Sequence, residues 1–595
     1  MNYTKEQVTK FEKLGINSFS QLALLIPHSY EDLNLYNTLQ QDKSQLIDAT
    51  VNSVKNNPNS IQITFFVHNF NHTLTGVLFR PKPYMIHQYK VGSREFYFGK
   101  IECNGMGCSM AMPKKVMQIG SITAKYKCGM RSDAMGRFVS KYLTLENLLA
   151  EGIKESIALE VMKLHFPTQE VLQSKELSSE ALYALKYIEL FIYMKELSAK
   201  RRYFQPLKSI KKTYKKWLEI LPFKLTAEQL QTIEDIKKDI AKDVSAKRMI
   251  VGDVGSGKTM VILATAYMNR YNTTILMAPT TILANQLFEE AQKFLPDMQS
   301  VLVTNKTKKI DLSAFNFIIG THALLYRELP SATVVMVDEQ HRFGTLQRNM
   351  LEKIVSDGEK KPHYFQFSAT PIPRTQAMID TAHIDVSLIT STPFIKDIDS
   401  NVIHKSNFKE LLVRIKSEIA KDNQVLIVYP LVEQSEMIAY QSIEEARGYW
   451  EKNFEDVYVT HGKDKEKERV LLEFREKGKL LIATTVVEVG ISLPRLTTVV
   501  IVGAERLGLS TLHQLRGRVS RTGLKGYCYL YTNQNSSDRL DKFVNTVSGF
   551  DIANLDLKFR KSGDLLKGTN QSGTQFKWVD IGEDEVVVGE VKEAF

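Results

Sequence analysis

A glycine-rich loop at residues 252–259 has the composition of a phosphate-binding site. It reads Gly252-Asp253-Val254-Gly255-Ser256-Gly257-Lys258-Thr259, which satisfies the pattern G-x-x-x-x-G-K-[ST] between an apolar run and a helical pattern. The glycines let backbone N–H groups close around phosphate oxygens, and the following helix adds partial positive charge at its start. We expect Lys258 to reach the β- and γ-phosphates of ATP and the Thr259 hydroxyl to ligate Mg²⁺.

An acidic pair lies downstream of this loop. Asp338 and Glu339 directly follow the apolar run 334–337. An acidic pair that ends a strand is weak evidence alone, but after a phosphate-binding loop it has a specific use. Asp338 is predicted to hold Mg²⁺, and Glu339 to orient or deprotonate the water that attacks the γ-phosphate. The predicted reaction is ATP hydrolysis.

The elements that position these residues belong to two α/β lobes. From about residue 225, short β-branched runs alternate with helical patterns, and a second such series follows the polar stretch 391–402. This alternation is typical of parallel sheets flanked by helices. We therefore predict a first α/β lobe at 225–392, which holds the ATP site, and a second α/β lobe at 393–545.

The rest of the chain divides into smaller parts. Residues 1–45 carry apolar positions at helical spacing and are predicted to be helical, with Pro27 ending the pattern. In 46–145, short β-type runs separated by Asn, Gly and Pro predict an OB-fold-like barrel. A helical linker is predicted at 146–224, and residues 546–595 follow the second lobe.

Charge and composition favour a polyanion partner. The chain has 595 residues, a formal net charge of +11 and no apolar run near the ~20 residues of a membrane span. A basic excess suits nucleic acid, although a merely cationic surface would give the same number. The lysine-rich stretch 208–216 has the same two interpretations, a DNA contact or a solvated helix face.

Four cysteines in so long a chain predict a reducing cytosol without a disulfide framework. Cys103, Cys108 and Cys128 fall in one segment, which raises the alternative of a zinc site. A zinc site usually needs a second close pair of ligands, and none is present here. Small buried thiols are the favoured interpretation.

Three further segments resemble the ordered motifs of superfamily-two helicases. They are 338–341, Ser368-Ala369-Thr370 and Gln514-Leu515-Arg516-Gly517-Arg518-Val519-Ser520-Arg521. The resemblance implies that both lobes are RecA-like and that Arg518 and Arg521 reach the γ-phosphate from the second lobe. It also implies that a set of polar side chains couples ATP state to nucleic acid and that two residues hold adenine. The coupling set is Gln340, His341, Ser368, Thr370 and Gln514, and the adenine contacts are Phe223 and Gln229.

Four segments narrow the resemblance to the group that contains RecG and the transcription-repair coupling factor. They are 338–344, 368–374, 484–490 and 504–510. The β-rich domain near the N-terminus favours a RecG-type helicase. The resemblance implies a monomer of the bacterial cytoplasm and nucleoid that unwinds and remodels stalled forks and Holliday junctions in recombination and repair. It implies DNA contacts by two wedge aromatics, Phe79 and Tyr84. It also implies that 546–595 holds a translocation motif, a helical hairpin and loop followed by a tail, in which Lys558, Arg560 and Gln571 contact DNA.

Some positions depart from the family pattern, and other functions stay open. Ser492 replaces an acidic residue, Ser520 replaces a glycine and Asn570 replaces an arginine, which bears on DNA coupling more than on hydrolysis. A duplex DNA translocase like the coupling factor and an RNA helicase of the same superfamily are alternatives. A non-enzyme alternative is an OB-fold DNA-binding scaffold with an inert nucleotide site.

Overall fold

A computed structural model describes most of the chain. The described residues are 4–40, 42–82, 87–104, 107–117, 119–169, 172, 176–370, 372–394, 397–431, 440–485, 492–520, 523–567 and 576–595. They form two compact units. The first contains Met1–Lys195, Gln575–Val579 and Glu593–Phe595, and the second contains Glu196–Thr574 and Asp580–Lys592.

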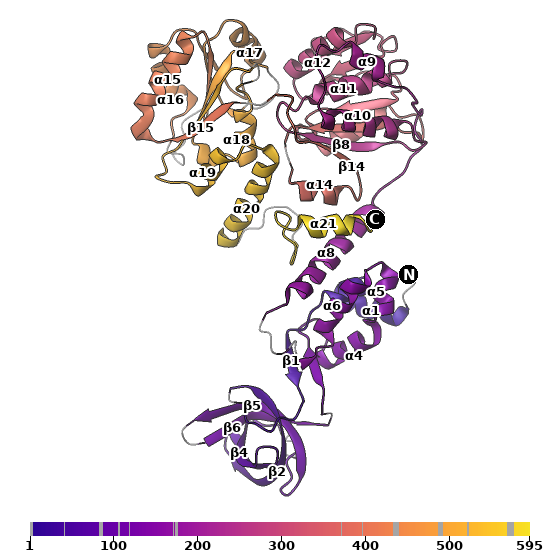
Figure 1. Cartoon of the computed structure of the whole chain (residues 1–595), viewed down its shortest axis with the longest axis vertical. Helices are drawn as coiled ribbons and strands as arrows, with labels where there is room; N and C mark the ends of the chain where they lie inside the picture. Colours follow the sequence, from indigo (N-terminus) through magenta and orange to yellow (C-terminus); the bar gives the residue numbers. More distant parts are fainter. Residues whose placement is uncertain are drawn as a thin grey trace. The chain divides into compact units, whose positions relative to one another are not determined.

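A closed barrel in the first unit confirms the predicted OB-like fold (Figure 1). Its order is β2-β3-β4-β6-β5, and β3 alternates buried and less buried side chains as a half-buried strand does. Phe65 and Tyr97 fill its interior. The strands are β2 (Ser44–Asn57), β3 (Ser60–Val67), β4 (His72–Phe79), β5 (Arg94–Asn104) and β6 (Gly107–Val116).

Helices and a small sheet make up the remainder of this unit. Residues 1–45 are helical only as far as α2, because the chain after Pro27 forms β1 and pairs antiparallel with β7. Glu151 ties α2 to α5 by accepting the Phe19 and Ser20 backbone N–H groups at 2.8 and 2.7 Å. The elements are α1 (Lys5–Leu14), α2 (Phe19–Ala23), β1 (Ser29–Asp32), β7 (Ile122–Lys125), α4 (Ser132–Tyr142), α5 (Leu145–Glu151), α6 (Glu155–His165) and α8 (Ser179–Ala199).

The expectation that all the cysteines are free thiols is wrong. Cys103 and Cys108 are cross-strand partners on β5 and β6 and form a disulfide. Directly opposed residues of an antiparallel pair lie close enough for their sulfurs to bond, and the sequence alone does not reveal this register. Cys528 is buried as expected, Cys128 is half-buried, and no group of potential metal ligands forms among the described residues.

A buried histidine makes the stability of the first unit depend on pH. The His165 ring lies between the Tyr126 hydroxyl at 3.0 Å and the Ala23 carbonyl at 2.9 Å. Burial lowers the pKa of His165 to about 4, although the bond to Ala23 acts to raise it. The unfolded chain, with a His pKa of about 6.5, therefore takes up the proton first as the pH falls. This contribution to stability is complete above pH ~6.5 and is lost between that pH and ~4.

We expect the unfolding free energy to fall by about 2 kcal/mol between pH 7.5 and pH 5 through His165 alone. His165→Gln keeps a donor for Ala23 and an acceptor for Tyr126 but does not titrate. Calorimetry of the full chain at both pH values should show a smaller loss in this variant than in the natural protein. Equal losses would contradict the assignment.

The second unit contains two parallel sheets, which confirms the two RecA-like lobes (Figure 1). The sheet of lobe 1 has the order β10-β11-β9-β12-β13-β8-β14, and its strands are almost wholly buried, as strands covered on both faces must be. They are β8 (Lys247–Gly252), β9 (Thr274–Met277), β10 (Ser300–Val303), β11 (Phe317–Gly320), β12 (Val334–Val337), β13 (His363–Ser368) and β14 (Asp385–Ile389). The helices of lobe 1 are α9 (Lys215–Glu219), α10 (Ala227–Ile240), α11 (Lys258–Met268), α12 (Thr281–Phe294), η1 (His322–Tyr326), η2 (Gln340–Arg342), α13 (Thr345–Ile354) and α14 (Arg374–Asp380).

The sheet of lobe 2 has the order β15-β20-β19-β16-β18-β17. Its strands are β15 (Ile398–Ile403), β16 (Gln424–Val428), β17 (Val457–Thr460), β18 (Leu480–Ala483), β19 (Leu496–Val502) and β20 (Gly526–Tyr531). Its helices are η3 (Lys405–Asn407), α15 (Phe408–Ala420), α16 (Ile443–Asn453), α17 (Lys467–Glu476), η5 (Ala504–Arg506), α18 (Leu509–Arg516) and α19 (Asp538–Asn545).

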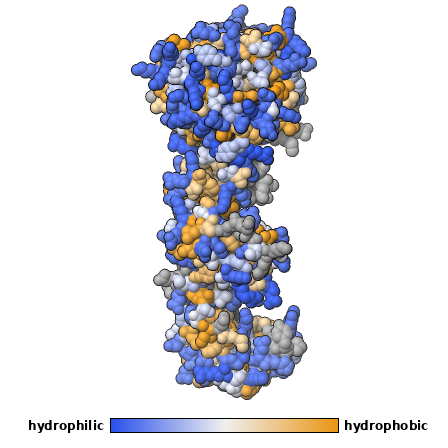
Figure 2. All heavy atoms as spheres, turned by 90° about the vertical axis from the view of Figure 1, so that its right-hand side faces the viewer, coloured by the Kyte–Doolittle hydropathy of each residue, from blue (hydrophilic) through white to orange (hydrophobic). Residues whose placement is uncertain are grey.

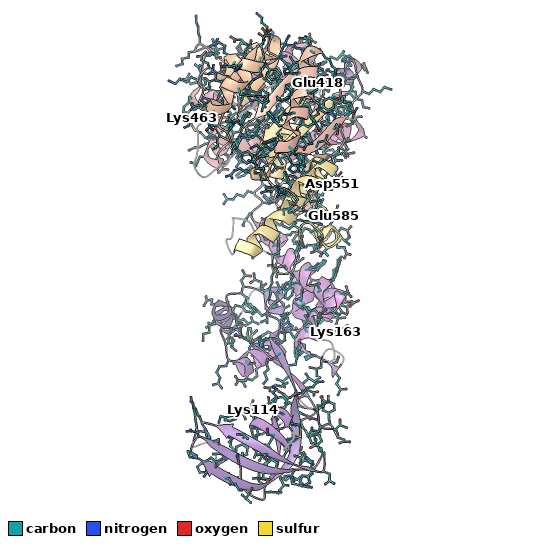
Figure 3. The ribbon with its side chains drawn as sticks, turned by 90° about the vertical axis from the view of Figure 1, so that its left-hand side faces the viewer. Lys114, Lys163, Glu418, Lys463, Asp551 and Glu585 are labelled. Atoms are coloured by element: carbon teal, nitrogen blue, oxygen red, sulfur yellow. A yellow bond between two sulfur atoms is a disulfide. The ribbon has the colours of Figure 1, made fainter. Side chains whose placement is uncertain are left out.

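Two helices follow lobe 2, α20 (Gly549–Lys567) and α21 (Glu585–Lys592), and α20 packs against α18. Figure 3 labels one acidic residue in the first turn of each, Asp551 and Glu585. The face of the molecule in Figure 2 carries mainly hydrophilic side chains with scattered hydrophobic ones. Among the described helices, none has the length and apolar character needed to cross a membrane.

Candidate nucleotide and DNA site

A cavity of about 640 Å³ lies where the phosphate-binding loop of lobe 1 meets lobe 2. Strand β8 delivers the loop at its carboxyl end, and α11 begins directly after it. Gly255 and Gly257 have φ angles of 79° and 75°, which favour glycine. A Cβ on Gly257 would lie 2.2 Å from Nε2 of Gln229, so the loop also needs glycine for close packing. The predicted residues in its lining are Phe223, Gln229, Val254, Gly255, Gly257, Lys258, Thr259, Asp338, Glu339, Gln514 and Arg518.

Lys258 lies on the loop itself. Its Nζ donates to the carbonyl oxygens of Gly252 at 2.8 Å and Asp253 at 3.1 Å. These bonds hold the ammonium group at the mouth of the loop, where backbone N–H groups and the start of α11 favour negative charge. The arrangement suits the β- and γ-phosphates of a nucleotide.

Two buried carboxylates face this ammonium. Asp338 and Glu339 follow β12 and are 7% and 9% exposed. Burial and the neighbouring Glu339 raise the pKa of Asp338 to about 7, and Lys258 acts in the opposite direction. Buried carboxylates are stabilised by a cation, and oxygen donors such as Asp338 and the Thr259 hydroxyl are those Mg²⁺ prefers. The residues present therefore fit Mg²⁺.

Glu339 is connected to the next motif. Its φ of 48° lies in the left-handed region, which is rare for a residue with a side chain and recurs at functional sites. Its Oε2 accepts the Ala369 backbone N–H at 3.0 Å. The Ser368-Ala369-Thr370 segment is thus in direct contact with the carboxylate predicted to handle water.

One pair of the predicted coupling residues bridges the two lobes. Gln514 Nε2 on α18 donates to Thr370 Oγ1 at 2.8 Å, and the Thr370 N–H donates to Ser368 Oγ at 3.2 Å. Gln340 accepts a hydrogen bond from Arg348 at 3.1 Å through its Oε1. The side chain of His341 lies outside the described residues.

Arg518 reaches the same cavity from lobe 2 and is 8% exposed. Arg521 lies outside the described residues. Two departures from the family pattern fall nearby: Ser492 lines the cavity, and Ser520 is buried with a φ of 61°. That φ explains why glycine suits position 520.

The two residues predicted to hold adenine differ in their surroundings. Phe223 is 47% exposed and contacts Phe294 edge to face. Gln229 is buried, its Oε1 accepts the Thr226 N–H at 2.8 Å, and its Nε2 donates to the Ser256 carbonyl at 2.7 Å. Each end of this amide makes one bond, and its second N–H and second oxygen lone pair could still pair with an adenine edge.

A second bridge between the lobes was not predicted. Asp253 Oδ1 in the phosphate-binding loop lies 2.5 Å from Nε2 of His513 on α18, and its Oδ2 accepts the Gly549 N–H at the start of α20 at 2.9 Å. Burial acts to raise the pKa of Asp253, but the bond and charge of His513 with the backbone N–H groups of Gly549 and Val254 lower it to about 2. Arg516 contacts His513 Nδ1 at 3.1 Å and the Thr546 carbonyl at 2.8 Å. The segment after lobe 2 is therefore bonded to the nucleotide loop.

We expect His513→Ala to lower the kcat of DNA-stimulated ATP hydrolysis about 10- to 100-fold, because a hydrogen bond to a buried charge contributes ~1.5–3 kcal/mol. ATP affinity should change less, since Asp253 approaches phosphate only through its backbone. His513→Gln, which can still donate to Asp253, should recover part of the rate. Steady-state kinetics with and without DNA measure the separate effects on kcat and on the KM for ATP. An unchanged kcat with a raised KM would contradict the positioning role.

The predicted DNA contacts are only partly within the described residues. Phe79 at the end of β4 is 58% exposed, so it is not part of the barrel core. The Lys558 ammonium on α20 lies 3.2 Å from a Glu583 carboxylate oxygen, and half of the lysine side chain is exposed. Tyr84, Gln571 and the side chain of Arg560 lie outside the described residues.

Comparisons with known proteins place the two lobes in recognised families. A model described as DEAD/DEAH box helicase matches residues 226–379, and one described as Helicase conserved C-terminal domain matches residues 405–523. Both matches fall on the parallel sheets that enclose the cavity.

Two relatives that match nearly the whole chain carry the same name. A Helicobacter pylori protein named ATP-dependent DNA helicase RecG is 43% identical over 98% of this chain and 96% of its own length. An Aquifex aeolicus protein of the same name is 31% identical over 96% of this chain and 80% of its own length. A solved structure of RecG bound to a three-way DNA junction has a TM-score of 0.55 at 25% identity, covering 99% of this chain and 83% of that one.

Proposed function

Because this chain belongs to the RecG family of ATP-dependent DNA helicases, we propose that it unwinds and remodels branched DNA such as stalled replication forks and Holliday junctions. The single observation that carries the proposal is the cavity that is lined both by Lys258 of lobe 1 and by Arg518 of lobe 2. A nucleotide bound there would contact both lobes, so its hydrolysis would change their separation.

The residues of the cavity have separate roles in hydrolysis. When bound, Mg²⁺ would be held by Thr259 and Asp338 and would supply positive charge to the phosphates. Lys258 binds the β- and γ-phosphates, and Glu339 orients the attacking water and receives its proton. Arg518, with Arg521, stabilises the charge that develops on the γ-phosphoryl group. Thr370, Gln514 and the Asp253–His513 bridge relay lobe closure to the DNA-bound segments.

DNA contacts would come from two places. The exposed Phe79 ring, with Tyr84, fits a wedge that stacks on bases at a junction, and such stacking contributes ~1–3 kcal/mol per base. Lys558, Arg560 and Gln571 would contact the duplex that the lobes pull. We propose that the protein acts as a monomer in the bacterial cytoplasm and nucleoid, in recombination and DNA repair.

One side-by-side measurement tests the proposal against its alternatives. ATP hydrolysis is measured with fork DNA, linear duplex, single strands and RNA at one salt concentration, since affinities for nucleic acid depend on salt. Fork DNA should stimulate most. Equal stimulation by linear duplex would favour a translocase like the coupling factor, and stimulation by RNA alone would favour an RNA helicase. If none of these nucleic acids stimulated ATP hydrolysis, the remaining alternative would be the DNA-binding scaffold with an inert nucleotide site.

A further inference from the structure

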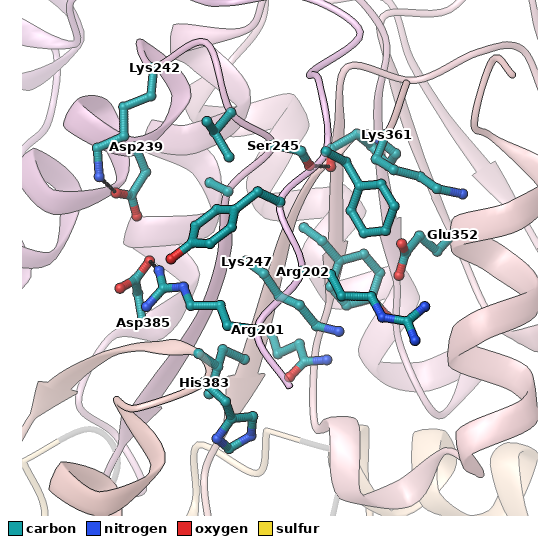
Figure 4. Close-up of a pocket in the computed structure, with 18 of the residues that line it drawn as sticks. Arg201, Arg202, Asp239, Lys242, Ser245, Lys247, Glu352, Lys361, His383 and Asp385 are labelled. Carbon is teal, nitrogen blue, oxygen red and sulfur yellow. Dashed lines mark hydrogen bonds and ion pairs between the residues drawn. The ribbon is translucent and has the colours of Figure 1, made fainter. Parts of the chain in front are cut away.

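A second cavity lies in lobe 1 where strands β8 and β14 begin, at the end of β8 opposite the phosphate-binding loop. It encloses about 530 Å³, within the range that accommodates a nucleotide-sized ligand. Strand β8 connects the two sites, because its first residue Lys247 lines this cavity and its last residue Gly252 opens the phosphate-binding loop. Residues 200–204 form another wall, as Figure 4 shows around Arg201 and Arg202.

The lining of this cavity is strongly basic. Seven lysine or arginine side chains line it against three carboxylates. Two of the carboxylates are already paired: Asp385 lies 2.8 Å from Arg201, and Asp239 lies 2.9 Å from Lys242, both drawn as dashed lines in Figure 4. Asp239 also accepts a 2.6 Å bond from Arg248. Glu352 is the third carboxylate, so the surplus of positive charge remains.

The positive charges of the lining act on a histidine among its residues. Burial lowers the pKa of His383, and the charges of Lys247, Lys200 and Arg201 lower it further, while Asp380 acts to raise it. The charges of Lys200, Lys247 and Arg201 therefore all act on this part of the wall. An anion that enters the cavity would meet several of them at once.

Aromatic rings stand beside the cations. Tyr203 is 68% exposed, with the Arg201 guanidinium 5.6 Å from its ring centre. Phe204 is 38% exposed, with the Lys361 ammonium 5.9 Å from its ring centre. Exposed rings interleaved with basic side chains are the way proteins hold unpaired nucleic-acid strands, with bases on the rings and phosphates on the cations.

We propose that this cavity binds an unpaired DNA strand, with phosphates on Lys200, Arg202 and Lys247 and a base stacked on Tyr203. The inference rests on the proposed function for the identity of the nucleic acid. The same phosphate-and-ring chemistry could come from a free nucleoside polyphosphate, and the test below separates the two sources.

The cavity has a bonded path to the hydrolytic site. Arg348 in its wall donates to Gln340 at 3.1 Å, and Gln340 is adjacent in sequence to Glu339. A phosphate that attracts Arg348 would compete for this bond. Binding of a DNA strand at the cavity can therefore affect the residues that bind ATP and position water.

The test uses the double variant Lys200→Ala/Arg202→Ala in the full chain. Both side chains are exposed, and neither forms an ion pair among the residues that the structure describes. Affinity for a labelled oligothymidine is measured over a range of salt concentrations. Each lost single-strand phosphate contact lowers the slope of log K against log salt by ~0.7, so a decrease of ~1.4 is expected. Between ~50 and ~200 mM salt, the variant should lose ~7-fold less affinity than the natural protein.

Matched controls make the result specific. Lys405→Ala/Lys409→Ala removes two charges from exposed positions of lobe 2 and should leave the slope unchanged. Tyr203→Leu should weaken oligothymidine binding and leave the slope intact. ATP binding by each variant reports correct folding of the lobe.

Three outcomes overturn the inference. In the first, the salt slope for oligothymidine is unchanged in the double variant. In the second, the slope changes only for duplex DNA. In the third, a fluorescent guanosine triphosphate binds the Lys258→Ala variant and loses that binding when Arg202 is also mutated, while the oligothymidine slope stays the same. Fork-stimulated ATPase that persists in the double variant with an unchanged slope would reject this cavity and leave the proposed function intact.

Discussion

Lys258→Ala should reduce ATP hydrolysis at least ~10³-fold while fork DNA still binds. Removing one preorganised charge donor from a reacting group commonly costs 10²–10³-fold, and Lys258 carries a full charge at the centre of the phosphate site. The DNA contacts are proposed for other elements, so they do not depend on this ammonium. Unwinding should disappear together with hydrolysis.

The controls for this prediction separate charge from packing. Lys258→Met keeps most of the length of the side chain without its charge and should be as inactive as the alanine variant. Lys293→Ala removes an exposed lysine on α12 that lies over Phe294 and should keep the natural rate. ATPase assays and fork binding are measured on the same preparations. Turnover that survives in Lys258→Ala would show that the phosphates bind elsewhere.

The features predicted best were those encoded by short contiguous segments. The loop at 252–259 positions its own N–H groups, because a strand, three glycines and a helix start determine its conformation locally. The acidic pair after β12 and the two parallel sheets follow from the same regular alternation of strand and helix. Each of these features needs only neighbours in the chain.

The features that were missed depend on residues far apart in the sequence. Asp253 and His513 are separated by 260 positions, and only the packing of the two lobes brings a loop carboxylate to a helix of the other lobe. The disulfide depends on the register of one hairpin, which shifts along β5 and β6 and is not visible in the spacing of Cys103 and Cys108. Gln229 was expected to face adenine, yet the same amide also fits the capping box of α10.

These cases share a physical cause. A side chain with several possible partners takes the one that tertiary packing brings closest, and burial makes an unmet polar group costly. The cations of segment 200–202 are neighbours in the sequence, but only the fold makes this segment one wall of a cavity.

Arg518→Ala is expected to lower ATP turnover by ~10³–10⁵-fold, the range measured for arginines supplied across an interface to a transferring phosphoryl group. Its buried side chain lines the cavity from lobe 2, so it can meet the γ-phosphate only when both lobes contact the nucleotide. ATP affinity should change little, because the charge it stabilises develops during the reaction. The variant should therefore bind ATP and DNA but fail to cycle.

Two further variants test whether geometry or charge is needed at position 518. Arg518→Lys keeps the charge but loses the planar fork and should recover only a small part of the rate. Arg447→Ala removes an exposed arginine of α16 that pairs with Glu451 and should behave as the natural protein. Single-turnover hydrolysis separates the chemical step from ATP binding. A normal single-turnover rate in Arg518→Ala would remove this arginine from the reaction and with it the link between hydrolysis and closure of the two lobes.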